Sequence, residues 1–577
     1  MKRIVSILLV SLLVLAACRG GSQSGGASSS GGDSGSSSSS TSSSSSSSET
    51  QSSGGDSAEQ ADGPIWSEPD VMPIVQEPVT YNIMGVYFPH VVPHEDNEMW
   101  KVYEEKTNVK INWESVAYND QWERLALSLT SGDYPDAYFN FHISIAQLLI
   151  YGGQGILIPL QDMIAEQGPN ITSTYNRFPH IKANSTAPDG NIYSLYQFDP
   201  AYHMATSQKM FINQQWLIDS GLGMPSTIEE FADVLRYFRD NDMNGNGNAG
   251  DEIPLAGHIG TDPSIFLINP FILNVNKGLL VVNDKVTPIF NTDEYRNAMR
   301  YVHSLYAEDL IGTETYTMDG NAFQGLINRP DEMIIGAVGT SMYQGFWMNI
   351  ELFDDGLGCD TYTSVPPLVG PLGKGQTPLT YDGVSIERSI QITNVCKDPV
   401  ILIKWIDWFY DEDNAFWQMN GYEDIDWEWV DEESINGERP AYKFIQSLDH
   451  GSAGAGDNRR LHNQGPMFFP NEKRYREAKV PGSGGLALYT DSVKYLEYQD
   501  PNQKYLPFTV WMDEETARVS SQLQTNIDNY VNESRARFVV GELDVESGWD
   551  AYVSEFAALD LDAYVAIWQN VYDVANR

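Results

Sequence analysis

Residues 225–255, PSTIEEFADVLRYFRDNDMNGNGNAGDEIPL, join a strongly amphipathic segment to a loop rich in Asn, Asp and Gly. Thr227 and Glu230 have the spacing of a capping box, which satisfies free backbone N–H groups at the start of a helix. Apolar residues then recur at helical spacing and line one face: Ile228, Phe231, Leu235 and Phe238. The stretch therefore predicts a capped helix over 225–240 that packs on a core and opens directly into a polar loop.

The loop raises the question of a metal ion. Asp242, Asn244 and Asn246 place hard oxygen atoms at alternate positions, and glycines separate them. Calcium takes about six to eight such oxygens, and glycine lets the chain curl around the ion. A polar Asn-Gly turn without metal has the same composition. The pattern alone leaves both interpretations open.

Outward from this stretch, short apolar runs alternate with amphipathic segments, which favours an α/β architecture. Segments 79–88, 110–118 and 134–141 have the character of strands, whereas 97–109 and 121–132 have helical periodicity, with Gly132 as the stop. A second strong helix is predicted over 397–416, where Asp398 suits the N-cap and Pro399 the first helical position. Residues 550–576 are predicted to be helical as well.

Bulk composition restricts the function. The 577 residues exceed what one core can hold, so about two or three domains are expected. The formal net charge of −44 argues against a nucleic-acid partner, because phosphate neutralisation needs clustered Lys and Arg. No Cys-x-x-Cys or His-Glu-x-x-His spacing occurs, which disfavours a zinc site.

The N-terminus predicts export. A short positive start precedes an apolar run that is too short to span a membrane comfortably and that ends in Leu15, Ala16, Ala17 and Cys18. This "LAAC" resembles the bacterial lipoprotein signal, which implies a signal peptide over 1–17 and lipidation of Cys18. Residues 18–63 are dominated by Ser and Gly and are expected to form a disordered tether.

Two further cysteines, Cys359 and Cys396, remain in the folded part. An exported compartment permits a disulfide between them, and two buried thiols are the alternative.

Six stretches, in this order, resemble an extracellular solute-binding protein of family 1, within a long lipoprotein subgroup related to alginate-binding proteins. They are "LAAC" (15–18), "SGDYPDAYF" (131–139), "NIYSLYQF" (191–198), the stretch from "MFIN" to "EIPL" (210–255), the stretch from "ITNVC" to "DIDW" (392–427), and the stretch from "RFVV" to "NVYD" (537–573). Each stretch is weak alone, but together they span nearly the whole chain after the tether.

The resemblance implies an α/β, two-lobed periplasmic-binding-protein-like fold (type II), with a hinge and a ligand cleft between the lobes. Lobe 1 is expected to comprise 64–205 and a return segment, 385–435. Lobe 2 is expected to comprise 206–384, with the metal loop at 242–252, and most of a C-terminal helical region, 436–577. The implied function is that of a monomeric solute-binding component of an ABC importer, which delivers an oligosaccharide to membrane permease subunits. Lipid-anchored at Cys18, it would work on the outer face of the bacterial cytoplasmic membrane, where the tether raises its concentration near the permease.

The same resemblance implies an EF-hand-like calcium loop. Side chains of Asp242, Asn244 and Asn246, the carbonyl of Asn248, and Asp251 with Glu252 would supply the oxygens. An additional Gly250 departs from the family pattern and puts the register of the last ligands in question. A Ca²⁺ ion enclosed in this way would brace the loop and take no part in chemistry.

Candidate ligand contacts come from loops that match cleft positions of the family. Sugar rings stack on aromatic planes and their hydroxyls need amide or carboxylate partners, and the chain is 12% aromatic. The candidates are Asn140, His142, Gln197, Asp199, Tyr202, Tyr343, Trp347 and Asp382.

Two other classes of protein remain as alternatives. A polysaccharide-cleaving enzyme would need two carboxylates at a defined separation, and with 79 acidic residues no pair stands out. No G-x-S-x-G elbow or P-loop occurs. A sensory or adhesive surface lipoprotein of the same fold is compatible with every motif above, so transport and sensing stay open here.

Overall fold

The computed structural model describes residues 67–68, 71–88, 91–327, 333–340, 361–445, 458–462, 464–481 and 483–576. Within it, 62–577 forms one compact unit. Cys18, Tyr343, Trp347 and Cys359 lie outside the described residues. In the described part of the chain, no helix combines the length and the apolar character needed to cross a membrane.

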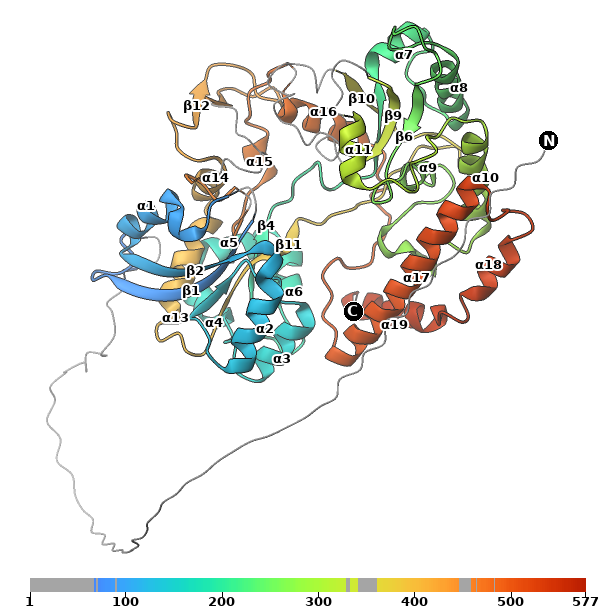
Figure 1. The fold of residues 1–577 in the computed structure, drawn as a ribbon. Coiled ribbons are helices and arrows are strands. Elements are labelled where there is room, and N and C mark those ends of the chain that lie inside the picture. Colours follow the sequence, from blue (N-terminus) through green and yellow to red (C-terminus); the bar gives the residue numbers. More distant parts are fainter. Residues whose placement is uncertain are drawn as a thin grey trace, which may run out of the picture. The chain divides into compact units, whose positions relative to one another are not determined.

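The first sheet has five strands in the order β2-β1-β3-β11-β4 (Figure 1). β1 pairs in parallel with β2 and β3, while β11 runs antiparallel to β3 and β4. The strands are β1 (Val79–Tyr87), β2 (Val109–Ala117), β3 (Ala137–Phe139), β4 (Leu195–Phe198) and β11 (Val384–Ile392). The chain thus leaves this sheet after β4 and returns to it in β11, and these two strands pair with each other although about 190 residues separate them in sequence.

Helices accompany the first sheet. They are α1 (Glu98–Thr107), α2 (Gln121–Ser131), α3 (Ile145–Gly153), α4 (Gln161–Gln167), α5 (Pro169–Arg177), α6 (Pro179–Ser185) and α13 (Pro399–Asp407). Three of them, α1, α2 and α13, lie where the sequence predicts helices. Asn97 caps α1 through its side chain, and α2 stops at Gly132, whose φ of 77° is the left-handed conformation that glycine tolerates. The predicted helix over 397–416 divides, because a 3₁₀ turn at Trp408–Tyr410 separates α13 from α14 (Glu412–Asn420).

The second sheet has four strands in the order β10-β5-β9-β6. Its strands are β5 (Lys209–Asn213), β6 (Ile253–Ala256), β9 (Ile335–Thr340) and β10 (Tyr362–Val365). Its surroundings include α7 (Gln214–Ser220), α8 (Ile228–Asp240), α9 (Ser264–Leu267), α10 (Asp293–Ala307), α11 (Gly320–Ile327) and the hairpin of β7 (Leu279–Val282) with β8 (Lys285–Pro288).

Helix α8 confirms the prediction from the opening stretch. The Thr227 hydroxyl accepts from the backbone N–H of Glu230, and the Glu230 carboxylate accepts in return from Thr227, which completes the capping box. The four predicted apolar residues are all buried. Phe238 packs so tightly on the second sheet that a Cβ at Gly336 would lie 2.4 Å from its ring, so only glycine fits that strand position.

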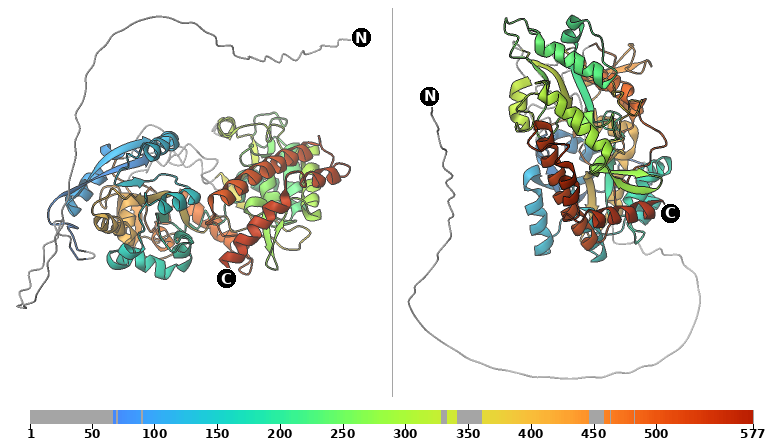
Figure 2. Two further views of the ribbon diagram at one scale, coloured as in Figure 1. Left: turned by 90° about the horizontal axis from the view of Figure 1, so that it is seen from below. Right: turned by 90° about the vertical axis from the view of Figure 1, so that its right-hand side faces the viewer.

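The C-terminal part is helical, as predicted. It contains α16 (Gly484–Leu496), α17 (Glu514–Val540), α18 (Trp549–Glu555) and α19 (Leu561–Ala575). The segment 550–576 forms two helices, because Asp560 adopts a left-handed φ of 56° between them. Helix α17 packs along α10 and against α19, which Figure 2 shows in red beside green.

Separate apolar clusters accompany the two sheets, one with the first sheet and two with the second. Trp405 of α13 lies in the first cluster, and most of α17 to α19 contributes to the second. The first cluster also contains Tyr442, Leu461 and Met467, so it extends past the expected boundary at 435. The reason is that the chain returns along β4. The backbone N–H of Phe198 donates to Met467 O at 2.8 Å, and the backbone N–H of Phe469 donates to Phe198 O at 3.0 Å.

Candidate functional site

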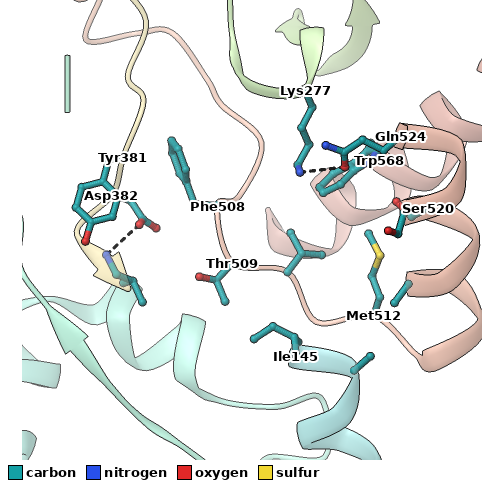
Figure 3. Close-up of a pocket in the computed structure, with 15 residues that line it drawn as sticks. Ile145, Lys277, Tyr381, Asp382, Phe508, Thr509, Met512, Ser520, Gln524 and Trp568 are labelled. Carbon is teal, nitrogen blue, oxygen red and sulfur yellow. Dashed lines mark hydrogen bonds between the residues drawn. The ribbon is translucent and has the colours of Figure 1, made fainter. Parts of the chain in front are cut away.

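A cavity of about 380 Å³ lies where the first cluster, the return segment before β11 and the C-terminal helices meet (Figure 3). Its size falls within the range of about 300–1,000 Å³ that is usual for small-molecule sites. The lining residues are Ile145, Ala146, Lys277, Tyr381, Asp382, Val384, Phe508, Thr509, Val510, Met512, Ala517, Ser520, Ser521, Gln524 and Trp568. They come from five segments of chain, which is typical of a site built by tertiary packing.

Most of the wall is apolar. Ile145 begins α3, whose capping box on Ser144 fixes the start of that helix. Phe508 and Met512 belong to the segment that leads into α17, and the Trp511 indole N–H of that segment donates to Asn184 O at 2.9 Å. This contact holds the segment against α6. Trp568 of α19 supplies an aromatic wall on the other side.

Lys277 is the cation of the cavity. It lies in the short 3₁₀ turn Asn276–Gly278 with a left-handed φ of 61°, a conformation that is uncommon outside glycine and Asn. Its Nζ donates to Gln524 Oε1 at 3.3 Å and lies 4.7 Å from the centre of the Trp568 ring. Burial lowers the pKa of Lys277, and the Asp528 carboxylate opposes this shift.

Asp382 is the acceptor of the cavity. Its Oδ2 accepts from Asn184 Nδ2 at 3.1 Å, and its Oδ1 accepts from the Val384 backbone N–H at 3.2 Å. Burial raises the pKa of Asp382, and these hydrogen bonds oppose the shift. The cavity therefore offers one cationic donor and one carboxylate acceptor across an apolar, partly aromatic space. Such a combination suits a ligand with apolar faces and hydroxyl groups.

Asp382 is the one candidate among the described residues that lines this cavity. Asp199 and Tyr202 lie together elsewhere, around the Arg474 guanidinium. Asp199 forms an ion pair with Arg474, and the Tyr202 ring stacks on Tyr475 with centroids 5.5 Å apart. Burial raises the pKa of Tyr202.

Three further candidates are engaged within the first sheet and its loops. Asn140, with φ 60°, accepts from the Gly465 N–H at 2.8 Å and donates to Val86 O at 3.3 Å, so its amide joins strand β1 to the loop at Gly465. The backbone N–H of half-buried His142 donates to Gln121 Oε1 at 3.0 Å. Gln197 is buried in β4. The roles of these side chains toward a ligand stay predictions, as do those of Tyr343 and Trp347.

Sequence reasoning missed Lys277, Gln524 and Trp568. Lys277 carries no motif, and Trp568 belongs to a helical apolar stripe that indicates ordinary packing. Only the tertiary arrangement brings them together.

The loop at 242–252 is curled as its glycines allow, with φ of 75° at Gly245 and 89° at Gly247. The Asp242 carboxylate accepts from the backbone N–H groups of Gly245 and Gly247, each at 2.8 Å, and of Asn246 at 3.1 Å. The carboxylate thus organises the turn from its centre.

The donor set of this loop fits a hard cation. Asp251 Oδ1 and Glu252 Oε2 are buried carboxylate oxygens without a hydrogen-bond partner in the described part of the chain. Asn246 Nδ2 donates to the other oxygen of Asp251, and Met243 N–H to the other oxygen of Glu252. No three His, Cys, Asp or Glu side chains are grouped as a metal site among the described residues, so amide and carbonyl oxygens would have to supplement the carboxylates.

Of the two cysteines in the folded part, Cys396 is a buried free thiol, and burial raises its pKa to about 12.

Two sheets with separate cores, three crossings of the chain between them and a cavity beside the crossing that returns to β11 define the class of two-lobed solute-binding proteins. Residues 91–416 match the family model described as "Bacterial extracellular solute-binding protein". This match covers more than half of the chain, and the protein therefore belongs to that family.

The relatives are carbohydrate-binding and lipoprotein members. The chain is 28% identical over 518 residues to the fructooligosaccharide ABC transporter substrate-binding protein FusA of Streptococcus pneumoniae serotype 4 (strain ATCC BAA-334 / TIGR4), covering 86% of this chain and 91% of FusA. It is 24% identical over 494 residues to lipoprotein LipO of Bacillus subtilis (strain 168), covering 82% and 88%.

Solved structures of solute-binding proteins superpose on this chain over most of its length. The FusA complex with kestose superposes with a TM-score of 0.68 at 26% identity, covering 86% of this chain and 100% of that one. An EF-hand mutant of FusA with fructo-nystose gives the same values. A solute-binding protein of Bifidobacterium longum subsp. infantis superposes with a TM-score of 0.73 at 21% identity, covering 86% and 98%, which shows the shared fold.

Proposed function

We propose that the protein is the oligosaccharide-binding component of an ABC importer. The observation that carries this proposal is the cavity beside the return crossing, in which Lys277, Asp382 and Trp568 surround an apolar space in a member of the solute-binding family. The ABC-transporter role and fructooligosaccharide ligand of the relative FusA support it. The ligand is a neutral oligosaccharide, bound without chemical change and released to permease subunits by a monomeric binder.

The chemistry of the walls supports a neutral ligand. Lys277 and Asp382 carry opposite charges, so neither a polyanion nor a polycation is complemented by both. A sugar ring presents a nonpolar face to Trp568 and hydroxyl groups to the lysine and the aspartate. Because Lys277 and Asp382 already have internal partners, a sugar hydroxyl would share these hydrogen bonds without the cost of an unpaired charge.

Anchoring at Cys18 belongs to the same proposal. The residues from 1 to 66 lie outside the described part, so the support is the signal-like sequence and the lipoprotein relative LipO. The anchor would hold the binder on the outer face of the cytoplasmic membrane. Cys18→Ser should release the protein from the membrane fraction into the medium, and retention of the variant in that fraction would contradict the anchor alone.

We also propose a structural Ca²⁺ ion in the loop at 242–252. The buried, unpartnered oxygens of Asp251 and Glu252 support it, together with the EF-hand of FusA. Asp242, Asn244, Asn246, Asp251 and Glu252, with the Asn248 carbonyl, would hold the ion. Its chemistry is charge neutralisation of clustered oxygens, which braces the connection between α8 and β6.

The ligand proposal is tested by thermal shift and calorimetry with a panel of neutral oligosaccharides, beginning with kestose. A ligand at 100 times its Kd adds about 2.7 kcal/mol to the free energy of unfolding, which is readily detected. Lys277→Met should weaken the binding of an active sugar roughly threefold to tenfold, since a hydrogen bond to a charged group contributes about 1.5–3 kcal/mol and the existing bond to Gln524 reduces the net gain. The matched control is Lys285→Met, which removes an exposed lysine of the β7–β8 hairpin.

Two results would contradict the proposal. If no sugar of the panel shifts the unfolding transition, the ligand is of another class. If Lys285→Met weakens binding as much as Lys277→Met does, the cavity is not the site. Chromatography of the sugar recovered after long incubation separates a binder, which returns it intact, from an enzyme, which shortens it.

A further inference from the structure

A second aromatic crevice lies on the first sheet, at its far edge. It has a volume of about 450 Å³ and lies between α1 and β2, the outermost strand. Its lining residues are His94, Glu95, Asn97, Trp100, Lys101, Glu104, Val109, Lys110, Ile111, Asn112, Trp113 and Trp405. None of them lines the first cavity. β1 and β3 separate β2 from β11 in the sheet, so the two sites are at least about 14 Å apart at a strand spacing of about 4.8 Å.

The floor of the crevice includes the Trp113 indole, which packs against other aromatic rings. The Trp113 ring centroid lies 4.4 Å from that of His94 and 4.9 Å from that of Trp100, and the two partners lie 6.1 Å from each other. Partners on opposite faces of an indole would be separated by nearly the sum of the first two distances. His94 and Trp100 therefore do not lie on opposite faces of Trp113. The indole is half-buried and lines the crevice together with both of these partners.

The support behind Trp113 is rigid. His94 is buried, its Nδ1 accepts from the Trp100 indole N–H at 3.2 Å, and its Nε2 donates to Val86 O at 3.1 Å. Gly85 leaves the room for this stack, because a Cβ there would lie 2.7 Å from His94 and 2.9 Å from Trp113. The indole is thus presented in a fixed orientation at low entropic cost to a ligand.

Polar groups are available at the rim. Lys101 and Glu104 lie three positions apart on α1, and in the described part of the chain neither side chain forms a hydrogen bond or an ion pair. Glu95 accepts from the Ser115 hydroxyl. The outer edge of β2 also carries backbone N–H and C=O groups that no described strand covers. A donor, an acceptor and an aromatic face therefore surround the crevice.

From this geometry we propose that the α1–β2 crevice is a second carbohydrate site. It takes one neutral sugar ring, stacked on the Trp113 indole, with its hydroxyl groups accepting from Lys101 Nζ and donating to Glu104. The opposite charges at the rim favour a neutral ring over a charged one. A single ring on one indole predicts a dissociation constant in the millimolar range, about 4 kcal/mol of binding free energy. The site is independent of the first cavity and of the transport role.

Fluorine NMR of the full-length protein labelled with 5-fluorotryptophan tests this site. Trp113→Phe identifies the Trp113 resonance by its loss, and Trp568→Phe and Trp122→Phe identify two references. The Trp568 resonance reports ligand binding in the first cavity. The resonance of Trp122, an exposed indole on α2, reports unspecific contact with sugar. Kestose, maltotriose and methyl glucoside are titrated to about 50 mM, which would saturate a millimolar site. The Trp113 resonance should shift saturably while that of Trp122 stays unchanged.

The double variant Lys101→Ala with Glu104→Ala leaves the indole in place and should weaken the shift of Trp113 at least fivefold. The double variant should leave the titration of the Trp568 resonance unchanged. A Trp113 resonance that no sugar moves would overturn the proposal, as would equal shifts of Trp113 and Trp122 or an unchanged affinity in the double variant. Movement of Trp113 without movement of Trp568 would uphold the crevice and contradict the first cavity, so the two proposals fail separately.

Discussion

Replacement of Asp242 by Asn is expected to remove most of the calcium response of the protein while leaving its fold intact. The Asp242 carboxylate is the centre of the loop, since it accepts from three backbone N–H groups with both oxygens. An Asn side chain keeps one acceptor oxygen, loses the negative charge and introduces an NH₂ group that faces the same N–H groups. It is therefore a poor ligand for a cation and a poor organiser of the turn.

The magnitude follows from mass action. Calcium at 100 times its Kd adds about 2.7 kcal/mol to the free energy of unfolding. For a lobe of about 150–250 residues, each kcal/mol corresponds to roughly 2–4 °C, so the second lobe should unfold roughly 5–10 °C higher in calcium than in EDTA. A hundredfold weaker site at the same calcium concentration would be half-occupied and add about 0.4 kcal/mol, or roughly 1 °C.

Differential scanning fluorimetry of wild type and variant, each in calcium, magnesium and EDTA, measures this response. The difference between calcium and EDTA is the decisive quantity, because Asp242→Asn also removes hydrogen bonds that exist without metal. Magnesium should have little effect, since it requires near-octahedral geometry at shorter distances. The matched control is Asp240→Asn, two residues earlier, which breaks only an exposed pair with Arg239 at 2.7 Å. It should retain the full response. Identical melting of the wild type in calcium and EDTA, or an undiminished response in Asp242→Asn, would refute the calcium site.

Three further predictions concern the fold around the sites. Thr227→Ala removes the capping box of α8 and should cost about 1 kcal/mol in the free energy of unfolding, measured by urea denaturation. Thr525→Ala, at an exposed position of α17, should cost clearly less. Gly383→Ala should lower the melting temperature by several degrees, because φ is 96° there and a Cβ would lie 2.6 Å from the Phe198 ring; an unchanged melting temperature would contradict the tight crossing. Burial lowers the pKa of His94 to about 4, so its neutral form contributes stability that is complete above about pH 6.5 and is lost as the pH falls toward 4. Ring ¹⁵N shifts at pH 5 should show a neutral imidazole that is protonated at Nε2. An imidazolium at that pH would contradict the burial.

Elements with local determinants could be predicted from the sequence. The capping box and apolar stripe of α8, the glycine stop of α2 and the strand–helix alternation from β1 to β3 all depend on residues within one turn or one strand of each other. The division of the predicted helix over 397–416 was harder to predict, because the 3₁₀ turn between α13 and α14 contains no glycine or proline to signal the end of a helix. The first core likewise extends past 435 through pairing of 467–469 with Phe198, a contact between positions about 270 residues apart.

The candidate site was predictable only at one point. Asp382 was a candidate because its loop matches a cleft position of the resembled family near the return crossing, and the structure places it in the lining of the cavity just before β11. Lys277 and Trp568 could not be found, since a lysine in a short turn and a tryptophan in an apolar stripe have common structural roles. Their approach to 4.7 Å depends on the packing of α19 against the hairpin of β7 and β8, which no local pattern encodes.

The internal partners of the two charged residues bear on release as well as on binding. A delivery protein must give up its ligand, and a charged group left unpaired in a buried cavity would oppose that step by several kcal/mol. Lys277 retains Gln524 and the Trp568 face, and Asp382 retains Asn184 and the Val384 N–H, when the space between them contains no ligand. The sugar therefore competes with contacts that already exist, so the net gain from each charged residue is a fraction of a full ionic hydrogen bond. Affinity then rests mainly on apolar contact with Trp568, Phe508 and Met512, which is lost gradually as the walls separate and leaves no unpaired charge behind.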